Sequence, residues 1–195
     1  MKEFPEEEKN NLKERLNIKN NDVVLVTTSR LVLKNGVKDA IKSVSLLPLN
    51  YKFLILGEGD LRAELETLVG SLTLNDRVKF LGFVSHDQIP LYFSVSDIFI
   101  RTSLSEGLGN SFLEAMAFGL PVVATPVGGI LDFLKDGETG ILVKPEDTFS
   151  IKEGILSLED ENFKNSIKYN AKDLVLNKYN WEIISKDFDN LLENI

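Results

Sequence analysis

Four elements follow one another directly in residues 98–125, whose sequence is IFIRTSLSEGLGNSFLEAMAFGLPVVAT. The apolar runs 98–100 and 122–125 are typical of short strands that are covered on both faces. Between them, 111–118 has the pattern of a helix that ends at Gly119-Leu120-Pro121, because glycine suits the position after a helix and proline cannot extend it. A strand, a loop, a helix and a second strand in this order indicate two parallel strands joined by a helical crossover.

The same alternation continues on both sides of this stretch. Further strand-like runs lie at 23–28, 53–56, 78–81 and 141–143, and helix patterns lie at 37–47, 60–72 and 87–96, with another starting near Gly129 and stopping before Asp136. The alternation predicts an α/β fold with a doubly wound, parallel, six-stranded sheet. After Pro145 only helix patterns remain, at about 148–158, 161–177 and 181–193. Residues 1–20 are expected to form a lead-in helix or interdomain segment, and residues 21–195 the domain itself.

Composition narrows the class of protein. The chain has 195 residues, of which 43% are hydrophobic and 27% are charged, and this length suits one domain with a substantial core. The formal net charge is −8, so neither a nucleic-acid backbone nor an anionic membrane surface is an expected partner. No apolar run approaches the ~18 residues of a membrane span. The acidic, polar start is no signal peptide, and a cytoplasmic protein is expected.

The cysteine and histidine content excludes further chemistry. The sequence has no cysteine, which rules out disulfides, thiolate metal sites and a cysteine nucleophile. The one histidine, His86, argues against a zinc site of the usual kind and against a Ser-His-Asp triad. His86 lies in a polar turn, and it is expected to be a solvated loop residue rather than a catalytic base.

Ligands of open parallel sheets bind beyond the carboxyl ends of the strands, so the loops there are the candidate sites. The loop at 29–36 places Arg30, Lys34 and a glycine before a helix, which is a phosphate-binding composition, although both cations are equally consistent with ordinary exposed charges. The loop at 57–62, GEGDLR, is two-thirds of a dinucleotide fingerprint. Arg62 stands where that fingerprint needs glycine, so a tight turn is expected there rather than an NAD site.

The most informative loop lies at 103–115. Glu106 is followed by a glycine-rich segment and then by a helix, for which Asn110 is the expected N-cap and in which Glu114 lies one turn inside. Glycines let backbone N–H groups approach a ligand, a helix N-terminus favours an anion, and Glu114 can reach back toward hydroxyl groups beside that anion. The alternative is that the helix dipole alone explains the acidic residues. The glycine pair at 128–129 is expected to serve close packing, with some contribution to the cleft wall.

Together these motifs resemble the C-terminal, nucleotide-sugar-binding domain of the GT-B-fold retaining glycosyltransferases of group 1, also called family four. The motifs that carry the resemblance occur in order as SRLV at 29–32, GEG at 57–59, FLGFV at 80–84, SDIFI at 96–100, SLSEGLGNSFLEAMA at 103–117, GLPVVAT at 119–125, GG at 128–129 and DGETG at 136–140. The resemblance covers roughly residues 15–195 and implies a Rossmann-like domain that forms the C-terminal half of a GT-B fold, with extra C-terminal helices.

The resemblance also implies roles for individual residues. Glu106 matches the carboxylate that faces the donor sugar and the reaction centre, Glu114 the one that binds the ribose hydroxyls, and Arg30 the arginine on the diphosphate. Phe83 and Val84 would border the base. Backbone and side-chain contacts to the sugar and the diphosphate would come from Gly107, Leu108, Gly109, Asn110 and Ser111.

Two positions depart from the family pattern. Asn35 stands where a phosphate-binding lysine is usual, with Lys34 one residue early. Lys34 is therefore expected to supply the cation at the reaction centre, and Asn35 at most a neutral hydrogen bond to the donor. Thr102 stands where the family usually has proline, with little consequence expected.

The implied function is transfer of a hexosyl group from a UDP- or GDP-linked sugar to a glycan, lipid or small-molecule acceptor, with retention and without a metal or a further cofactor. Arginine, lysine and a helix N-terminus would then stabilise the charge on the departing diphosphate. The family's N-terminal domain supplies much of the acceptor site and is absent from this sequence. A partner domain in cis or in trans is therefore expected, with peripheral membrane attachment left open, and the chain alone is expected to be inactive. Two alternatives remain: a non-catalytic nucleotide-sugar-binding module and a GT-B-like nucleotide-sugar epimerase.

Overall fold

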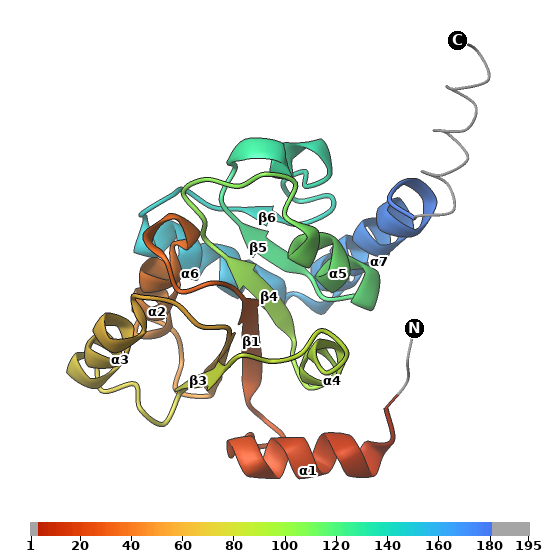
Figure 1. The fold of residues 1–195 in the computed structure, drawn as a ribbon. Coiled ribbons are helices and arrows are strands. Elements are labelled where there is room, and N and C mark those ends of the chain that lie inside the picture. Colours follow the sequence, from red (N-terminus) through yellow and green to blue (C-terminus); the bar gives the residue numbers. More distant parts are fainter. Residues whose placement is uncertain (1–3, 181–195) are drawn as a thin grey trace, which may run out of the picture.

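The computed structural model describes residues 4–180, so the helix expected at 181–193 lies outside the described residues. In this part of the chain, six parallel strands form one sheet in the order β3-β2-β1-β4-β5-β6 (Figure 1). The strands are β1 Val23–Thr28, β2 Tyr51–Leu56, β3 Val78–Gly82, β4 Ile98–Arg101, β5 Val122–Ala124 and β6 Ile141–Leu142. The predicted six-stranded parallel sheet is confirmed.

Helices connect the strands. The α-helices are α1 Glu6–Leu16, α2 Val37–Val44, α3 Arg62–Ser71, α4 Ile89–Phe93, α5 Asn110–Phe118, α6 Thr148–Leu156 and α7 Glu161–Lys178, and the 3-10 helices are η1 Leu33–Asn35, η2 Gly128–Asp132 and η3 Ser157–Glu159. The helix expected at 87–96 is only the short α4, and the one expected from Gly129 is the short η2. Two adjacent glycines, the first of them at φ 60°, form helix poorly and keep η2 short. Within residues 4–180, no helix combines the length and the apolar character needed to cross a lipid bilayer.

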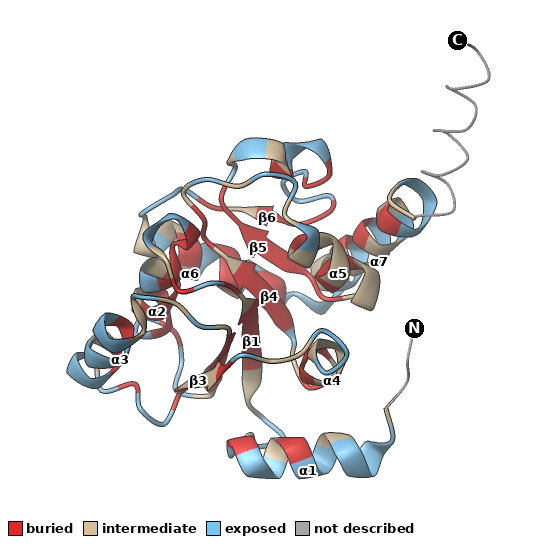
Figure 2. Ribbon diagram, viewed as in Figure 1, coloured by how far each residue is buried: buried red, intermediate tan, exposed pale blue. Residues whose placement is uncertain are grey.

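The sheet separates two apolar layers, which confirms the doubly wound arrangement (Figure 2). Alternate residues of β2 face opposite layers: Phe53 and Ile55 lie in the first, and Leu54 and Leu56 lie in the second. The first layer contains side chains of α2, α3 and α6, and the second contains side chains of α1, α4 and α5. The helix α7 contributes to both, with Ile167 in the first layer and Ala171 and Val175 in the second. The expected lead-in helix α1 therefore packs on the same core as the strands.

The strand order reverses between β1 and β4. From β1 the chain builds outward to β2 and β3, and from β4 it builds in the other direction to β5 and β6. The paired residues of β1 and β4 are Leu25 with Ile98 and Val26 with Phe99, so the last residues of both strands lie beyond this ladder. In open α/β sheets, such a reversal marks the carboxyl edge at which ligands bind.

Candidate functional site

Three of the loops singled out in the sequence meet at this carboxyl edge. The loop after β4 is joined to the loop after β1 by the Leu104 N–H, which donates to the Lys34 carbonyl over 2.7 Å. The loop after β5 is joined to it by the Gly129 N–H, which donates to the Gly107 carbonyl over 3.1 Å. These two bonds join residues that are 70 and 22 positions apart in the sequence, as expected of parallel strands with a common carboxyl edge.

Two glycines allow the loops to approach this closely. At Gly36, where φ is 63°, a Cβ atom would lie 1.8 Å from the Thr102 carbonyl oxygen, and at Gly128, where φ is 60°, it would lie 1.9 Å from the Glu106 carbonyl oxygen. The Thr102 hydroxyl also donates to the Gly36 carbonyl over 2.8 Å, a bond that the family's usual proline could not make. Gly128 therefore packs on the backbone of the predicted catalytic glutamate, in keeping with the packing role expected for the glycine pair.

Glu106 is almost buried and is paired with a cation that the sequence reading missed. Arg101 Nη2 lies 2.6 Å from Glu106 Oε1, and the two side chains are 13% and 8% exposed. The Ser103 hydroxyl donates to the same oxygen over 2.7 Å. Burial lowers the pKa of Arg101, and the charge of Glu106 opposes this shift. In the sequence, Arg101 could have been recognised as a site residue because it is a cation at the carboxyl end of an otherwise apolar strand, IFIR.

The N-terminus of α5 differs by one residue from the prediction. Gly109, at φ 70°, is the N-cap and Asn110 is the first helical residue, so the expected N-cap at Asn110 is wrong. A Cβ atom at Gly109 would lie 2.6 Å from the Phe112 ring, so the chain can enter the helix this way only with glycine. No side chain caps α5. Its first-turn N–H groups are therefore free of a capping side chain, beside the exposed Leu108.

Glu114 lies one turn inside α5 and is 37% exposed, as measured on its side chain. Its Oε1 lies 3.1 Å from Nε2 of His86, whose side chain is 83% exposed. His86 is thus a solvated loop residue, as expected, but it also contacts a predicted ribose-binding carboxylate. The same loop carries Phe83, which is 77% exposed, and Val84, which packs partly against the second apolar layer. The predicted base-bordering residues and Glu114 therefore lie on neighbouring segments.

The loop after β1 carries two exposed cations and one buried amide. Arg30 and Lys34 are exposed, whereas Asn35 is 3% exposed. The Asn35 Nδ2 donates to the Arg30 carbonyl over 2.8 Å, and Oδ1 has no hydrogen bond. The buried Asn35 side chain therefore holds the backbone of Arg30 in place. The sequence comparison at this position, asparagine in place of the usual lysine, does not reveal that role.

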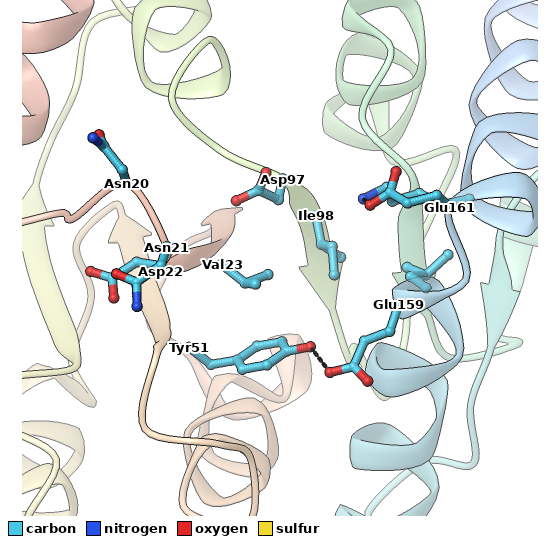
Figure 3. Close-up of a pocket in the computed structure, with 11 residues that line it drawn as sticks. Asn20, Asn21, Asp22, Val23, Tyr51, Asp97, Ile98, Glu159 and Glu161 are labelled. Carbon is cyan, nitrogen blue, oxygen red and sulfur yellow. Dashed lines mark hydrogen bonds and ion pairs between the residues drawn. The ribbon is translucent and has the colours of Figure 1, made fainter.

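A polar pocket with a volume of about 300 Å³ lies at the opposite, amino edge of the sheet (Figure 3). The Tyr51 hydroxyl donates to Glu159 Oε1 over 2.8 Å, and burial together with this bond raises the pKa of Tyr51. Asp97 Oδ2 accepts a hydrogen bond from the Val24 N–H over 2.7 Å and so joins the starts of β4 and β1. Among the described residues, no group of three or more acidic or histidine side chains is placed to hold a metal ion.

Comparison with known proteins assigns the family. The sequence model described as "Glycosyl transferases group 1" matches residues 8–174. The chain belongs to this family. An uncharacterized glycosyltransferase of Methanocaldococcus jannaschii is 35% identical to it over 188 residues, which are 95% of this chain and 48% of the relative. This group 1 glycosyltransferase chain spans about half the length of the curated relatives it matches.

Two solved structures agree with this assignment. HepE of Anabaena, crystallised in complex with UDP and glucose, has a TM-score of 0.90 at 26% identity over 98% of this chain and 53% of that chain. The C-terminal domain of the group 1 glycosyltransferase LpcC of Francisella tularensis has a TM-score of 0.79 at 26% identity over 92% of this chain and 95% of that chain. The predicted fold, a Rossmann-like C-terminal domain of the GT-B type, is confirmed.

Proposed function

We propose that this chain is the donor-binding half of a retaining hexosyltransferase that uses a UDP- or GDP-linked sugar. The observation that carries the proposal is the placement of Glu106 and Glu114 on either side of an uncapped helix N-terminus, at the reversal of the strand order in a group 1 glycosyltransferase. In the proposed reaction, the bond between the sugar and the diphosphate breaks and its electron pair leaves on the diphosphate. The sugar passes to a glycan, lipid or small-molecule acceptor held with the help of a second domain.

The charge on the departing diphosphate would be stabilised by groups that the chain itself supplies. The first-turn N–H groups of α5, which have no capping side chain, would face it from one loop, and the exposed Arg30 and Lys34 would face it from another. Fixed positive groups of this kind can replace a metal ion, so we propose a metal-independent reaction. Glu106 would face the sugar and Glu114 the ribose, and the two would not form an acid and base pair of the glycosidase type.

We expect the isolated chain to bind a nucleoside diphosphate in the presence of EDTA but to transfer no sugar. It holds the proposed diphosphate groups, but without a second domain the acceptor is not held in a reactive geometry. Calorimetry with UDP, GDP, ADP and their sugars, with EDTA or with Mg²⁺, measures the first point and identifies the base. HepE was solved with UDP, which makes UDP the first ligand to test.

Turnover by the chain alone, with a panel of simple acceptors, would contradict the proposed division between two domains. Failure to bind any of the nucleotides would remove the proposed function altogether. Tight binding of a nucleotide sugar by the chain, with no turnover even when a second GT-B domain is supplied in trans, would favour a non-catalytic binding module.

A change of Glu114 to glutamine should weaken binding of the nucleoside diphosphate by about 1–3 kcal/mol, because a charge-assisted hydrogen bond to ribose is lost. The melting temperature should fall little, since the change affects an interaction with the helix dipole of at most about 0.3–1 kcal/mol and one contact with the exposed His86. Calorimetry and thermal unfolding measure the two effects.

A matched control is Glu64→Gln. Glu64 lies in the first turn of α3, where it pairs with Lys38 over 2.8 Å. This change removes a similar carboxylate and should leave nucleotide binding unaltered. If Glu114→Gln binds like the parent protein but unfolds much more easily, the carboxylate serves only the helix.

A further inference from the structure

One side chain connects three parts of the candidate site. Arg101 Nη1 donates to the Thr28 carbonyl over 3.2 Å and to Ser111 Oγ over 2.9 Å. Its Nε donates to Ser103 Oγ over 3.2 Å, while Nη2 forms the ion pair with Glu106. A single guanidinium therefore joins the end of β1, the loop after β4 and the first turn of α5. It does so beyond the last paired residues of β1 and β4, where backbone hydrogen bonds no longer hold the two strands together.

The protein itself uses nearly all the hydrogen-bonding capacity of Arg101. A guanidinium has five N–H donors, and the four contacts just described engage four of them. Its central carbon lies 5.5 Å from the centre of the Phe112 ring, so this aromatic side chain is a further neighbour. With 13% of the side chain exposed, Arg101 has little left to offer a phosphate group. It is therefore placed to act through its neighbours rather than on a ligand, in contrast to the exposed Arg30.

The contacts of Arg101 orient the Glu106 carboxylate. Both Arg101 and the Ser103 hydroxyl contact Oε1, and Oε2 has no hydrogen bond to another residue within 4–180. Oε2 lies 3.9 Å from the position that a Cβ atom would take at Gly109, the N-cap of α5. A carboxylate that is only 8% exposed is costly to bury without a paired cation. Arg101 supplies this cation and leaves one carboxylate oxygen available.

We propose that Arg101 is a positioning residue, which holds the Glu106 carboxylate through Oε1 and directs Oε2 toward the sugar of the donor. This inference rests on the proposed function and adds a residue that governs the sugar but not the nucleotide. The diphosphate is assigned to Arg30, Lys34 and the backbone N–H groups at the N-terminus of α5, and Arg101 meets that helix through the Ser111 hydroxyl rather than these N–H groups, so loss of Arg101 should largely spare nucleotide binding. Lysine should not replace Arg101, because one ammonium group cannot reach Thr28, Ser111 and Glu106 at once.

The test compares two affinities in each variant: that for UDP and that for UDP-glucose, or for GDP and GDP-mannose if the nucleotide panel selects guanine. We expect R101M and R101K to weaken UDP-glucose binding by about tenfold, which is the effect of losing one charge-assisted hydrogen bond. Both variants should change UDP binding by less than about twofold. In an E106Q background, R101M should produce no further loss, because Arg101 acts through Glu106. S103A removes the other donor to Oε1, and it should lower the same ratio of affinities by about threefold, the effect of one neutral hydrogen bond.

The matched control is R77M. Arg77 is a second buried arginine, 8% exposed, whose guanidinium donates to the carbonyl groups of Leu47, Pro48 and Tyr51 away from the site. R77M should lower the melting temperature without changing the ratio of UDP-glucose to UDP affinity. Where R101M does not fold, R101K and S103A decide the result by the same ratio.

Four results would overturn the inference: an equal loss of UDP and UDP-glucose affinity in R101M, an unchanged UDP-glucose affinity, a further loss on adding R101M to E106Q, or a lowered ratio in R77M. The first of these would instead place Arg101 on the diphosphate. Failure of the parent chain to bind any nucleotide is a different outcome, because it refutes the proposed function before the variants are compared.

Discussion

Replacing Gly128 with alanine is expected to destabilise the fold by about 3 kcal/mol or more, and to weaken nucleotide-sugar binding strongly at the same time. A side chain at this position meets two obstacles. The backbone has φ 60°, and the added Cβ atom would lie 1.9 Å from the Glu106 carbonyl oxygen. Since neither backbone can rotate away as a flexible side chain would, the loop that carries Glu106 must move. Stability and donor affinity should therefore fall together.

Variants at two other glycines distinguish the cost of the backbone conformation from the cost of the steric contact. Gly119 has φ 91° with no atom within 4 Å of its would-be Cβ, so Gly119→Ala should destabilise by about 1–2 kcal/mol through backbone strain alone. Gly70, inside α3, has neither problem, and Gly70→Ala should stabilise by about 0.5–1 kcal/mol. Urea unfolding and calorimetry of the three variants measure the series. Equal destabilisation by Gly119→Ala and Gly128→Ala would show that the contact with Glu106 contributes nothing.

Removal of Arg30 is expected to have the largest effect on binding of the nucleoside diphosphate. Arg30→Ala should weaken it by about 2–3 kcal/mol, the range for a hydrogen-bonded charge, because Arg30 is exposed at the end of β1 and its fork can bind two phosphate oxygens. Lys34→Ala should weaken binding several-fold, since Lys34 lies farther along the loop on a flexible stem. Both changes should flatten the salt dependence of the affinity.

Asn35→Ala is expected to change the affinity less than either cation variant and to leave its salt dependence intact. The change removes the bond from Nδ2 to the Arg30 carbonyl, but it also removes a buried oxygen that has no partner. Lys38→Ala is the control for loss of a cation, because Lys38 pairs with Glu64 instead of facing the loop. Calorimetry at two salt concentrations compares the four variants. A damaging Asn35→Ala with a silent Lys34→Ala would show that Arg30 and neutral donors alone hold the phosphate.

The fold was predictable because each strand and helix has a local signal. The six apolar runs correctly predicted the positions of the six strands along the chain. The glycine and proline at 119–121 correctly predicted the end of α5. Errors were confined to boundaries and to helix type. The cap of α5 is Gly109 rather than Asn110, since the Phe112 ring fills the space at Gly109, and that contact is visible only in three dimensions.

The site was predictable only as far as its loops. The sequence predicted that Arg30, Glu106 and Glu114 lie at one edge of the sheet, because the loops that follow parallel strands all lie at the carboxyl edge. They did not reveal the partners of these side chains. Arg101 pairs with Glu106, which lies in the loop directly after β4, and it also donates to the Thr28 carbonyl 73 residues away. His86 contacts Glu114 across a sequence separation of 28 residues. Long-range polar pairing of this kind depends on how the strands are placed, not on the composition of either segment.

The loops at the carboxyl edge are tied to one another before any ligand arrives. The hydroxyl of Thr125 donates to the Ser103 carbonyl, and that of Thr102 donates to the Gly36 carbonyl, so two side chains at strand ends fix the backbones of the loops above them. Ordering a free loop on binding would lose conformational entropy, at about 0.5–1.5 kcal/mol for each side chain immobilised. Here the backbones of these loops are already ordered during folding. A nucleotide sugar bound here as proposed would therefore meet loops whose backbones are already held by the fold, and less of its contact energy would go into organising them.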